Sequence, residues 1–389
     1  MTAVVSSRTR PLIAVSMGDP AGIGPEVVLK AAGVIMGRSI RPTIVVVGNL
    51  DVMRETASRL EGDLPTPIEW DRRKRLKHSD SKLPVVNTGK LPLSARIPGA
   101  PTVDGAHAAY RYVFEAAQMT IRGEADALVT APINKEWLNR AGHHFPGHSE
   151  LLARLAHVRR WRMMFAGETL RIALVTVHIG LAQVPRALTR DAVLATITLL
   201  DEHLRTMVGI ARPRILVLGF NPHAGENGLF GDEEARVISP AIRQARGRGV
   251  DVHGPVAPDT AFIRAGRDQP FGFDGAVAMY HDQGLIALKA LEFDHAVNIT
   301  LGLPFVRTSP DHGTAYDIAG RGLANAASMV AAIEYAAKAA HGRRKPDKEK
   351  SPRRPNRFLR TTQPPRGSGR TVASRDRDVH PADSIRSSG

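Results

Sequence analysis

Short runs of Val, Ile and Leu alternate along the chain with longer stretches in which apolar residues recur at helical spacing. Most of the short runs end in Gly, Pro or Asn, as buried strands do. Because these runs are apolar on both faces and helices separate them, they predict an α/β protein with a largely parallel sheet. Examples of the expected strands are Leu12–Ser16, Thr43–Val47, Ala127–Thr130, Arg171–Val177, Arg214–Leu218 and Ala276–Met279.

Four stretches read as helices, with acidic residues in the first turn of three of them. They are Glu150–Ala156, Asp191–Met207, Glu233–Arg248 and Ser328–Ala340. After Gly342 the composition changes to Pro, Ser, Arg and Lys, with few sizeable apolar residues. Such a stretch cannot bury enough surface to offset its ordering entropy. We therefore expect a folded core over residues 1–341 and a basic, disordered tail over residues 342–389.

Composition narrows the functional class. The chain has 389 residues, of which 43% are hydrophobic and 23% charged, which is typical of a globular protein of about two domains. Of the formal charge of +15, the tail supplies +9 from 14 basic and 5 acidic side chains, so the core is only mildly basic. The absence of cysteine excludes disulfides, thiolate metal sites and a cysteine nucleophile. No apolar run is long enough to span a bilayer, and we expect a cytoplasmic protein.

The segment Met17-Gly-Asp-Pro-Ala-Gly-Ile-Gly-Pro-Glu26 follows the first expected strand and opens a helix. Glycines at such a turn expose backbone N–H groups, which suits an anion or a close ligand approach. The segment is neither the dinucleotide fingerprint nor a P-loop, because the spacing differs and the P-loop lysine is missing. A purely structural turn is an equally good interpretation.

Each of three separate expected strands leads to a histidine, and turn residues come directly after that histidine. The three histidines are His178, His223 and His281. Ligands collect beyond the carboxyl ends of strands in α/β sheets, so the three imidazoles could converge there. Three neutral imidazoles would hold a divalent metal and leave positions open for substrate oxygens. With 15 histidines in the chain, chance or loop packing is the alternative.

Polar and cationic residues gather near the last of these histidines, because Lys289, Asn298 and Arg307 lie within about thirty residues of His281. Arg and Lys bind phosphate or carboxylate, so two cations beside a metal suggest an anionic substrate. A His148-Ser149 pair leads into the helix that begins near Glu150, where Ser149 could bind ligand or cap the helix. Lys135 follows another strand end, in Thr130-Ala-Pro-Ile-Asn-Lys135.

Seven segments together resemble the 4-hydroxythreonine-4-phosphate dehydrogenase (PdxA) family, in the family's order and spacing over residues 11–340. They are MGDPAGIGPE, TAPINKE, FPGHSE, NPHAGENG, MYHDQG, NITLGLPFVRTSPDHGTA and DIAGRG. The resemblance implies a two-domain fold like that of isocitrate and isopropylmalate dehydrogenases, with largely parallel sheets and a cleft between domains. The boundary between the two α/β subdomains is not evident from the sequence.

By this resemblance, His178, His223 and His281 match the family's ligands for one divalent ion, either Zn, Mg or Co, at a site that two subunits of a homodimer share. His148, Ser149, Lys289, Asn298 and Arg307 match its substrate contacts. The family's usual His-Thr pair is here His148-Ser149, which keeps the hydroxyl and loses a methyl group.

The stretch from Asp311 to Asn325 resembles the nicotinamide cofactor loop of isocitrate and isopropylmalate dehydrogenases. It gives Gly313, Thr314, Ala315 and Asn325 as contacts for NAD or NADP. The implied reaction oxidises 4-phosphooxy-L-threonine to 2-amino-3-oxo-4-phosphooxybutanoate, which loses carbon dioxide to give 3-amino-2-oxopropyl phosphate in pyridoxal phosphate biosynthesis.

Individual catalytic roles remain open within this scheme. Lys289 and Arg307 would anchor phosphate and carboxylate, which orients the alcohol carbon toward the nicotinamide. His148, Asp259 and Asp282 are candidates for accepting the alcohol proton, and the two aspartates could instead orient imidazoles.

Other functions fit parts of the sequence. Relatives in the same family oxidise D-threonate or D-erythronate 4-phosphate, and a more distant branch acts on an aromatic cis-diol dicarboxylate. GENGLFG favours the sugar-acid branch, whereas NITLGLPF and FVRTSPDHGTA favour the pyridoxine enzyme, which we prefer.

A phosphate acyltransferase on a related fold needs neither nicotinamide nor the three histidines. The basic tail could bind nucleic acid, although a solvated appendage is the better interpretation.

Overall fold

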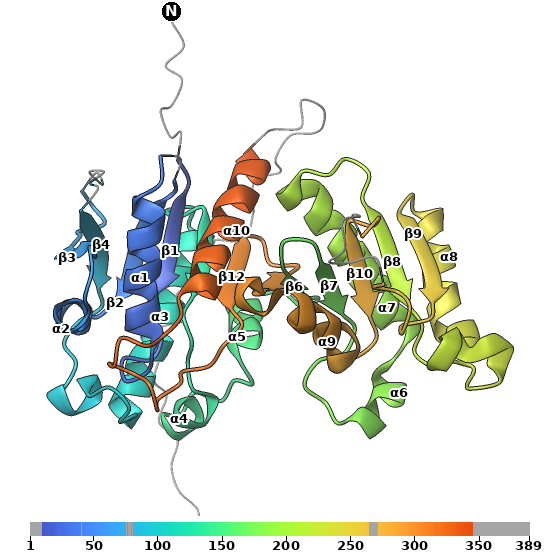
Figure 1. Cartoon of the computed structure of the whole chain (residues 1–389), viewed down its shortest axis with the longest axis horizontal. Coiled ribbons are helices and arrows are strands. Elements are labelled where there is room, and N and C mark those ends of the chain that lie inside the picture. Colours follow the sequence, from blue (N-terminus) through green and yellow to red (C-terminus); the bar gives the residue numbers. More distant parts are fainter. Residues whose placement is uncertain are drawn as a thin grey trace, which may run out of the picture. The chain divides into compact units, whose positions relative to one another are not determined.

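The structure, a computed structural model, describes residues 10–39, 41–74, 76, 79, 81–263 and 271–344. The strands within them form one sheet (Figure 1). They are β1 (Leu12–Ser16), β2 (Thr43–Gly48), β3 (Thr66–Glu69), β4 (Lys82–Asn87), β5 (Ala127–Thr130), β6 (Arg162–Ala166), β7 (Arg171–Leu174), β8 (Arg214–Leu218), β9 (Asp251–Val256), β10 (Gly275–Ala278), β11 (Val297–Leu301) and β12 (Val306–Pro310).

Helices connect most of these strands. They are α1 (Gly24–Met36), α2 (Leu50–Arg59), α3 (Val103–Ile121), α4 (Lys135–Arg140), α5 (His148–Leu155), α6 (Val184–Ala187), α7 (Arg190–His203), α8 (Ser239–Gly247), α9 (His281–Glu292) and α10 (Ala327–Arg344). Two π-helical turns, η3 (Leu204–Val208) and η5 (Glu234–Ile238), extend α7 and precede α8. Short 3₁₀ segments are η1 (Leu93–Arg96), η2 (Leu181–Gln183), η4 (Pro222–Gly228) and η6 (Phe293–His295).

The strand order is β3-β4-β2-β1-β5-β12-β11-β6-β7-β10-β8-β9. The first six strands are parallel and form a first block. The last four are also parallel and form a second block. Three antiparallel pairings in succession, β12 with β11, β11 with β6 and β6 with β7, join the blocks. The two blocks therefore run in opposite directions, and the antiparallel strands lie at the centre of the sheet.

The α/β class and the largely parallel sheet predicted from the sequence are confirmed. The six predicted strands all form, although β7 ends at Leu174, three residues earlier than expected. The four predicted helices correspond to α5, α7 with η3, η5 with α8, and α10. The central strands β6, β11 and β12 were not predicted. Their antiparallel pairing departs from the parallel pattern on which the prediction was built.

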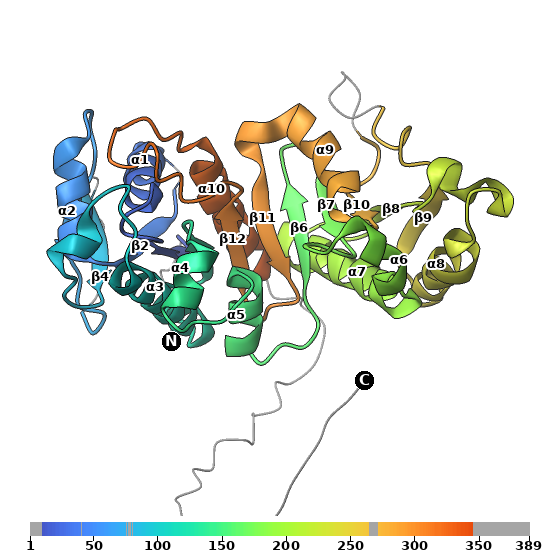
Figure 2. The same ribbon diagram turned by 90° about the horizontal axis from the view of Figure 1, so that it is seen from below.

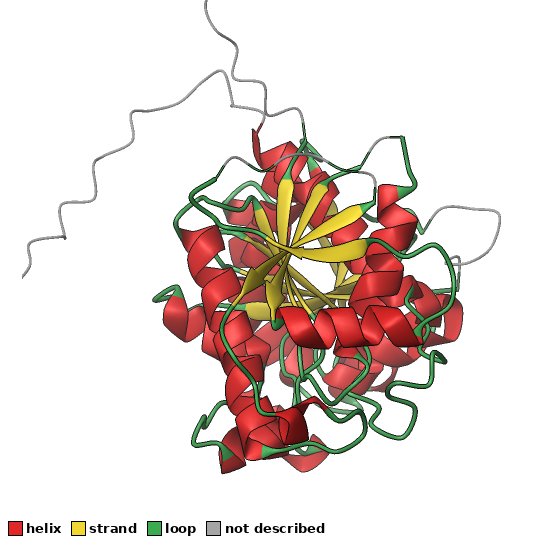
Figure 3. Cartoon of the chain, turned by 90° about the vertical axis from the view of Figure 1, so that its left-hand side faces the viewer, coloured by secondary structure: helices red, strands yellow, loops and turns green. Residues whose placement is uncertain are grey.

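Helices cover both faces of the twisted sheet (Figure 3). Alternate residues of a strand point to opposite faces, so Ile13 and Val15 join one core cluster and Ala14 another. The first cluster packs beneath α1, α7, α8 and α10 along one face of both blocks. On the opposite face, α3 and α5 cover the first block and α9 covers the second. The central strands lie between α5 and α9 on that opposite face.

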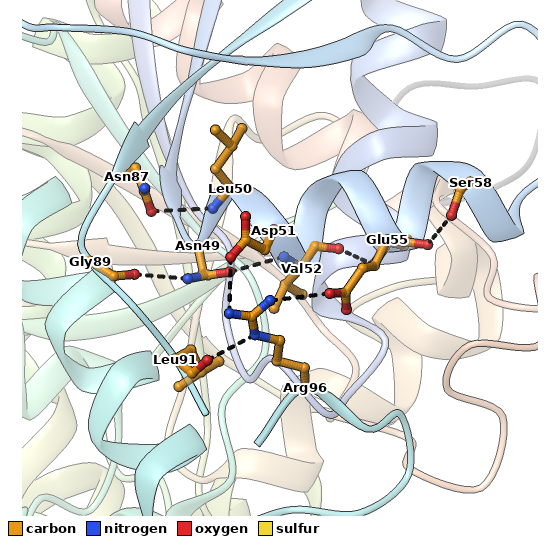
Figure 4. A network of polar contacts seen from close by, with 11 residues as sticks. Asn49, Leu50, Asp51, Val52, Glu55, Ser58, Asn87, Gly89, Leu91 and Arg96 are labelled. Atoms are coloured by element: carbon orange, nitrogen blue, oxygen red, sulfur yellow. Dashed lines mark hydrogen bonds and ion pairs between the residues drawn. The ribbon is translucent and has the colours of Figure 1, made fainter. Parts of the chain in front are cut away.

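Polar side chains are paired with one another and with the backbone at the start of α2 (Figure 4). Asn49 caps the helix by accepting a hydrogen bond from the backbone N–H of Val52 at 2.9 Å, as short polar side chains do at helix N-termini. Arg96 forms ion pairs with Asp51 at 2.9 Å and Glu55 at 3.2 Å. Its Nε also donates to the carbonyl oxygen of Leu91. Each nitrogen of this guanidinium therefore has a protein partner.

The described residues all belong to one compact unit. The expected basic tail falls largely on residues 345–389, which lie outside the described residues. The helix α10 continues to Arg344, beyond the expected end of the core at residue 341. The division of the core into two subdomains stays a prediction. No helix in the described part of the chain has the length and apolar character needed to cross a membrane.

Candidate functional site

A pocket of about 220 Å³ lies over the central antiparallel strands. Figure 2 shows α5 on one side of strands β11 and β6 and α9 on the other. Most of the residues that line the pocket are polar or charged: Thr130, Pro132, Ile133, Lys135, Pro146, Gly147, His148, Ser149, Glu150, Met163, Phe165, His178, His281, Asn298, Arg307, Ser309, Pro310, Asp311 and His312. The site predicted from the sequence therefore lies mainly where the two blocks of the sheet meet.

The register of the central strands places the pocket floor. Asn298 of β11 lies opposite Phe165 of β6 on one side and Ser309 of β12 on the other. Two residues further along β11, Thr300 lies opposite Met163. Since side chains alternate between faces with a period of two, these residues share the face on which the pocket opens. A shift of one residue in the register would turn the polar floor toward the opposite face.

Arg307 of β12 is the most deeply buried charge in this pocket, with a relative exposure of 2%. Its terminal nitrogens donate only to hydroxyl groups, to Thr300 Oγ1 at 3.1 Å and Thr130 Oγ1 at 2.7 Å. Burial lowers the pKa of this guanidinium to about 9, because a charge is costly away from water, and the negative charge of Glu150 only partly opposes the shift. None of the described carboxylates forms an ion pair with it. An anion entering the pocket would supply the missing counter-charge.

Several buried polar atoms of the pocket lack a hydrogen-bond partner within residues 10–344 as far as these are described. They are His148 Nε2, Asn298 Oδ1, Arg307 Nε and His312 Nε2. Native proteins pair nearly all buried polar groups, so each exception needs an explanation. All four residues line the same pocket. A polar ligand bound there would satisfy them together.

His148 and Ser149 form the first turn of α5, after Gly147. Ser149 does not cap the helix; its Oγ exchanges a hydrogen bond with Thr300 Oγ1 at 2.9 Å. Burial lowers the pKa of His148 well below its usual value, and the charges of Arg307 and Lys135 lower it further. The imidazole is therefore neutral at physiological pH. A neutral imidazole can both donate and accept a hydrogen bond from a ligand.

Two of the three strand-end histidines meet in the pocket. The strands β7, β10 and β8 are adjacent and parallel, so the residues after them emerge at one edge of the sheet. The rings of His178 and His281 are 5.7 Å apart between centroids. His281 Nδ1 is 2.7 Å from Asp282 Oδ1, which leaves Nε2 as the free ring nitrogen. Burial, followed by the charge of Lys135, lowers the pKa of His178 and favours its metal-binding neutral form.

His223 lies on the neighbouring loop after β8 and is not part of the pocket lining. The loop is unusual, because His223, Ala224, Glu226 and Asn227 all have positive φ. Such strained backbone persists where surrounding contacts fix it, and it is enriched at functional sites. Here Glu234 fixes the loop, since its Oε1 accepts the N–H groups of Phe220 and Asn221, each at 2.7 Å. In the described part of a single chain, no three His, Asp or Glu side chains converge into a metal site.

The remaining predicted catalytic residues lie outside the pocket lining. Lys289 Nζ forms an ion pair with Asp311 Oδ2 at 2.8 Å, and Asp311 itself lines the pocket. Asp282 contacts His281, as described above. Asp259 is exposed in the turn after β9. The structure thus places Lys289 and Asp282 beside the pocket and leaves Asp259 away from its wall.

The predicted cofactor residues belong to the loop between β12 and α10, residues 311–325, which begins at the pocket wall with Asp311 and His312. Gly313 is exposed, with open space where a side chain would extend. Thr314 is buried, and Ala315 has a φ of 39°. Asn325 Oδ1 accepts the N–H of Ala327 at the start of α10.

Two charged residues of the pocket wall received no role from the sequence, namely Lys135 and Glu150. Lys135 begins α4, where Asn134 caps the helix by accepting the N–H of Trp137 at 3.1 Å. The signal for Lys135 was present, because it follows a strand end after a Pro and an N-cap Asn. What the sequence did not indicate is that this strand, β5, pairs with β12 and so brings Lys135 near Arg307.

A second and larger cavity, of about 560 Å³, lies elsewhere, between α10, the β6–β7 turn and the end of α7. Arg171, Tyr335 and Lys338 are among its lining residues, and none of the predicted site residues contributes to it. The size of a cavity does not by itself indicate a chemical function. The smaller pocket, with its unpaired polar atoms, is the better functional candidate.

The chain as a whole is similar to several known proteins. Residues 40–336 match the family model described as pyridoxal phosphate biosynthetic protein PdxA. The chain is 46% identical over 338 residues to 4-hydroxythreonine-4-phosphate dehydrogenase of Geobacter metallireducens, covering 85% of this chain and 96% of that protein. It is 44% identical over 328 residues to D-threonate 4-phosphate dehydrogenase of Salmonella typhimurium, covering 83% and 97%.

A solved structure gives the same result in three dimensions. The crystal structure of 4-hydroxythreonine-4-phosphate dehydrogenase from Klebsiella pneumoniae superimposes with a TM-score of 0.74 at 41% identity, covering 85% of this chain and 99% of that one.

Proposed function

We propose, from the premise that this chain belongs to the PdxA family and is an oxidoreductase of that family, that it oxidises 4-phosphooxy-L-threonine with NAD or NADP. The observation that carries the proposal is the buried Arg307, with no carboxylate paired to it among the described residues, in a pocket of unpaired polar atoms. The product is 2-amino-3-oxo-4-phosphooxybutanoate, a β-keto acid that loses carbon dioxide. The step belongs to pyridoxal phosphate biosynthesis.

Two cations in the pocket wall suit a substrate that carries both a phosphate and a carboxylate. Arg307 can bind an anion through its unpaired Nε while Thr300 and Thr130 hold its other nitrogens. Lys135 adds a second positive charge on the same wall. Lys289 is already paired with Asp311, so it contributes a charge at the rim. Holding both anions fixes the substrate between them and so orients the alcohol carbon.

Neutral polar groups would bind the rest of the substrate. Asn298 Oδ1 can accept a hydrogen bond from the substrate amine or hydroxyl, and Ser149 can donate or accept one. His148 Nε2 is buried and unpaired among the described groups, and its lowered pKa keeps it neutral. We propose that His148 accepts the proton of the alcohol oxygen as hydride leaves the carbon that bears this oxygen. The proton and the hydride together account for the two hydrogens that the alcohol loses.

His178 and His281, with His223, would hold the divalent ion. Neutral imidazoles are suitable ligands, and the Asp282 contact to His281 Nδ1 orients that ring as carboxylates commonly do behind metal-bound histidines. A divalent ion there would act as a Lewis acid toward the substrate alcohol. Zn, Mg and Co all remain open.

A homodimer would complete this site. Apolar residues next to the histidines are exposed on the surface, among them Ile179, Leu181, Leu229 and Phe230. A second copy of the chain packed against them would bury this apolar area. It would also bring a strand-end histidine of one copy toward the pocket of the other copy.

The 311–325 loop would bind the nicotinamide cofactor. It starts at the pocket wall, and His312 Nε2 is buried there without a partner in the described part of the chain. The cofactor accepts the hydride when bound. A loop that leaves the substrate pocket directly can place the nicotinamide ring beside the alcohol carbon.

D-Threonate 4-phosphate is the second candidate substrate, because dehydrogenases for the two substrates are nearly equally similar to this chain, at 46% and 44% identity. The test is the rate of NAD or NADP reduction by the full chain with each compound. We expect kcat/KM to be at least tenfold higher for 4-phosphooxy-L-threonine. The opposite order would make D-threonate 4-phosphate the substrate. No reduction with either compound, in protein shown to hold metal, would overturn the dehydrogenase proposal.

A further inference from the structure

The glycine-rich segment at the end of β1 contacts the 311–325 loop at two separated points. At the first point, the backbone N–H of Ile23 donates to the carbonyl oxygen of Thr314 at 2.9 Å. Close by, the hydroxyl of Tyr316 donates to Asp19 Oδ2 at 2.7 Å, while Asp19 Oδ1 accepts the N–H of Ala21 at 2.9 Å. Asp19 is almost fully buried, with an exposure of 2%.

The second point lies one helical turn further along, on α1. Glu26 Oε1 accepts the backbone N–H of Ala324 at 2.9 Å and forms an ion pair with Lys30 Nζ at 2.8 Å. Lys30 also donates to the carbonyl oxygens of Gly322 at 2.7 Å and Ala324 at 2.9 Å. Glu26 is 1% exposed. The two points therefore hold the loop at residues 314–316 and at residues 322–324.

Close approach of the two backbones is part of this arrangement. A Cβ at Gly22 would lie 2.9 Å from the carbonyl oxygen of Thr314, closer than real Cβ contacts allow. Gly22 therefore lets the segment reach the loop, which accounts for one of the glycines in this motif.

The loop has little structure of its own between the two points. Its internal backbone hydrogen bonds run from the N–H of Ile318 to the carbonyl oxygen of Ala315 and from the N–H of Arg321 to that of Ile318, and both are 3.2 Å long. Ala315 is held at a φ of 39°, in the left-handed region. A segment with few internal bonds opens easily unless outside contacts fix it. The outside contacts are two buried carboxylates and a lysine, which are costly to bury and highly directional.

We propose that the segment from Met17 to Lys30 holds the 311–325 loop in its cofactor-binding shape before the cofactor arrives, with Asp19, Glu26 and Lys30 as positioning residues. The inference rests on the proposed role of this loop in binding NAD or NADP. Fixing the loop in advance removes part of the entropy cost of binding, so the contacts act on cofactor affinity rather than on substrate affinity.

The test compares two variants with a control in the full chain. Tyr316→Phe removes only the hydroxyl that reaches Asp19, and Lys30→Met removes the ammonium that bonds two loop carbonyls. Lys82→Met, at the exposed start of β4, is the matched control for loss of a surface lysine. The readouts are hydrogen exchange of residues 311–325 without ligand, the Kd of NAD by calorimetry, and the KM of the phosphorylated substrate.

We expect each variant to speed exchange of the loop amides and to raise the Kd of NAD by about tenfold, as loss of one charge-assisted hydrogen bond does. The substrate KM should change by less than about twofold, and Lys82→Met should match the unmodified chain. An unchanged Kd of NAD would overturn the inference, whether or not loop exchange rises. An equal rise in the Kd of NAD and the substrate KM would also overturn it, because it would indicate general destabilisation.

The outcome is separable from that of the proposed function. If the unmodified chain bound NAD but oxidised neither phosphorylated substrate, the proposed reaction would fail while the loop measurements still tested the inference. If it oxidised substrate and the variants bound NAD normally, the inference alone would fail. A variant that did not fold would show it in thermal unfolding, and Glu26→Gln, which keeps the acceptor for Ala324 and weakens the pair with Lys30, would then take its place.

Discussion

Arg96, which is largely buried, and Arg307, which is fully buried, show how differently this chain treats a positive charge. Arg96, beside α2, is paired with Asp51, Glu55 and the carbonyl oxygen of Leu91 (Figure 4). Arg307, in the pocket, touches only threonine hydroxyls and leaves Nε unpaired among the described groups. Burying a charge is costly in both places, and only Arg96 has the cost offset by the protein. The difference supports the proposal that Arg307 binds a ligand, whereas Arg96 stabilises the fold.

The same contrast extends to histidines. His203 is buried and its Nε2 bonds the hydroxyl of Tyr335 at 2.8 Å. The Nε2 atom of His148 is also buried, but it forms no hydrogen bond with the described part of the protein. We expect substitutions of paired groups to change stability and substitutions of unpaired pocket groups to change catalysis.

The largest expected effect is at the imidazole pair. His178→Ala or His281→Ala should lower kcat/KM on the order of 10⁴-fold and abolish metal retention, because each removes a proposed ligand. Metal analysis of the purified variants, alongside turnover, measures both. His253→Ala, an exposed histidine bonded to Asp251, is the control and should leave both unchanged. Full activity of chelated, metal-free protein would contradict the metal assignment.

Arg307→Ala should lower kcat/KM for the phosphorylated substrate by about 10³-fold, mainly through KM, because a buried charged partner of the substrate is lost. The KM for NAD should change far less. Arg96→Ala is the direct counterpart and should lower the melting temperature with little effect on the substrate KM. Equal effects of Arg307→Ala on both KM values would argue against its contact with substrate.

Acid should destabilise the fold through His203. Burial lowers its pKa to about 4, whereas in the unfolded chain it titrates near 6.5. The unfolded state therefore binds the proton first, so this stabilisation is present above pH 6.5 and is lost as the pH falls from 6.5 to 4. The full difference is about 3 kcal/mol.

His203→Gln keeps a hydrogen-bond partner for Tyr335 and cannot be protonated. Its free energy of unfolding, from denaturant titrations at several pH values, should fall less steeply between pH 6.5 and 4 than that of the unmodified chain. Parallel pH profiles of the two proteins would show that His203 is not the group responsible.

The smallest effect is expected at Lys135. Lys135→Met keeps the length of the side chain and removes its charge, so the KM for the phosphorylated substrate should rise about tenfold. Lys82→Met, at the exposed start of the distant strand β4, should have no effect on KM. If Lys135→Met behaved like this control, the second anion of the substrate would have to be bound at Lys289, which would mean that its pair with Asp311 opens.

The sequence determined the elements built from long apolar patterns, and it pointed to several residues that line the pocket. Runs such as Thr43–Val47 form strands because they are apolar on both faces, and the three strand-end histidines could be found by their position alone. The strand β11 was missed although Val297-Asn-Ile-Thr-Leu301 alternates apolar and polar residues, the pattern of an antiparallel strand. Its polar positions include Asn298 of the pocket floor.

Tertiary structure alone decided which residues meet. Lys135 reaches the wall near Arg307 because β5 pairs with β12, a contact between strands more than 170 residues apart in the chain. Likewise, Asp19 and Glu26 find their partners in the 311–325 loop only through the folded sheet. Local pattern reports how each segment can bury its apolar side chains. Which buried charge remains unpaired depends on strand order and register, which are set by the packing of the whole chain.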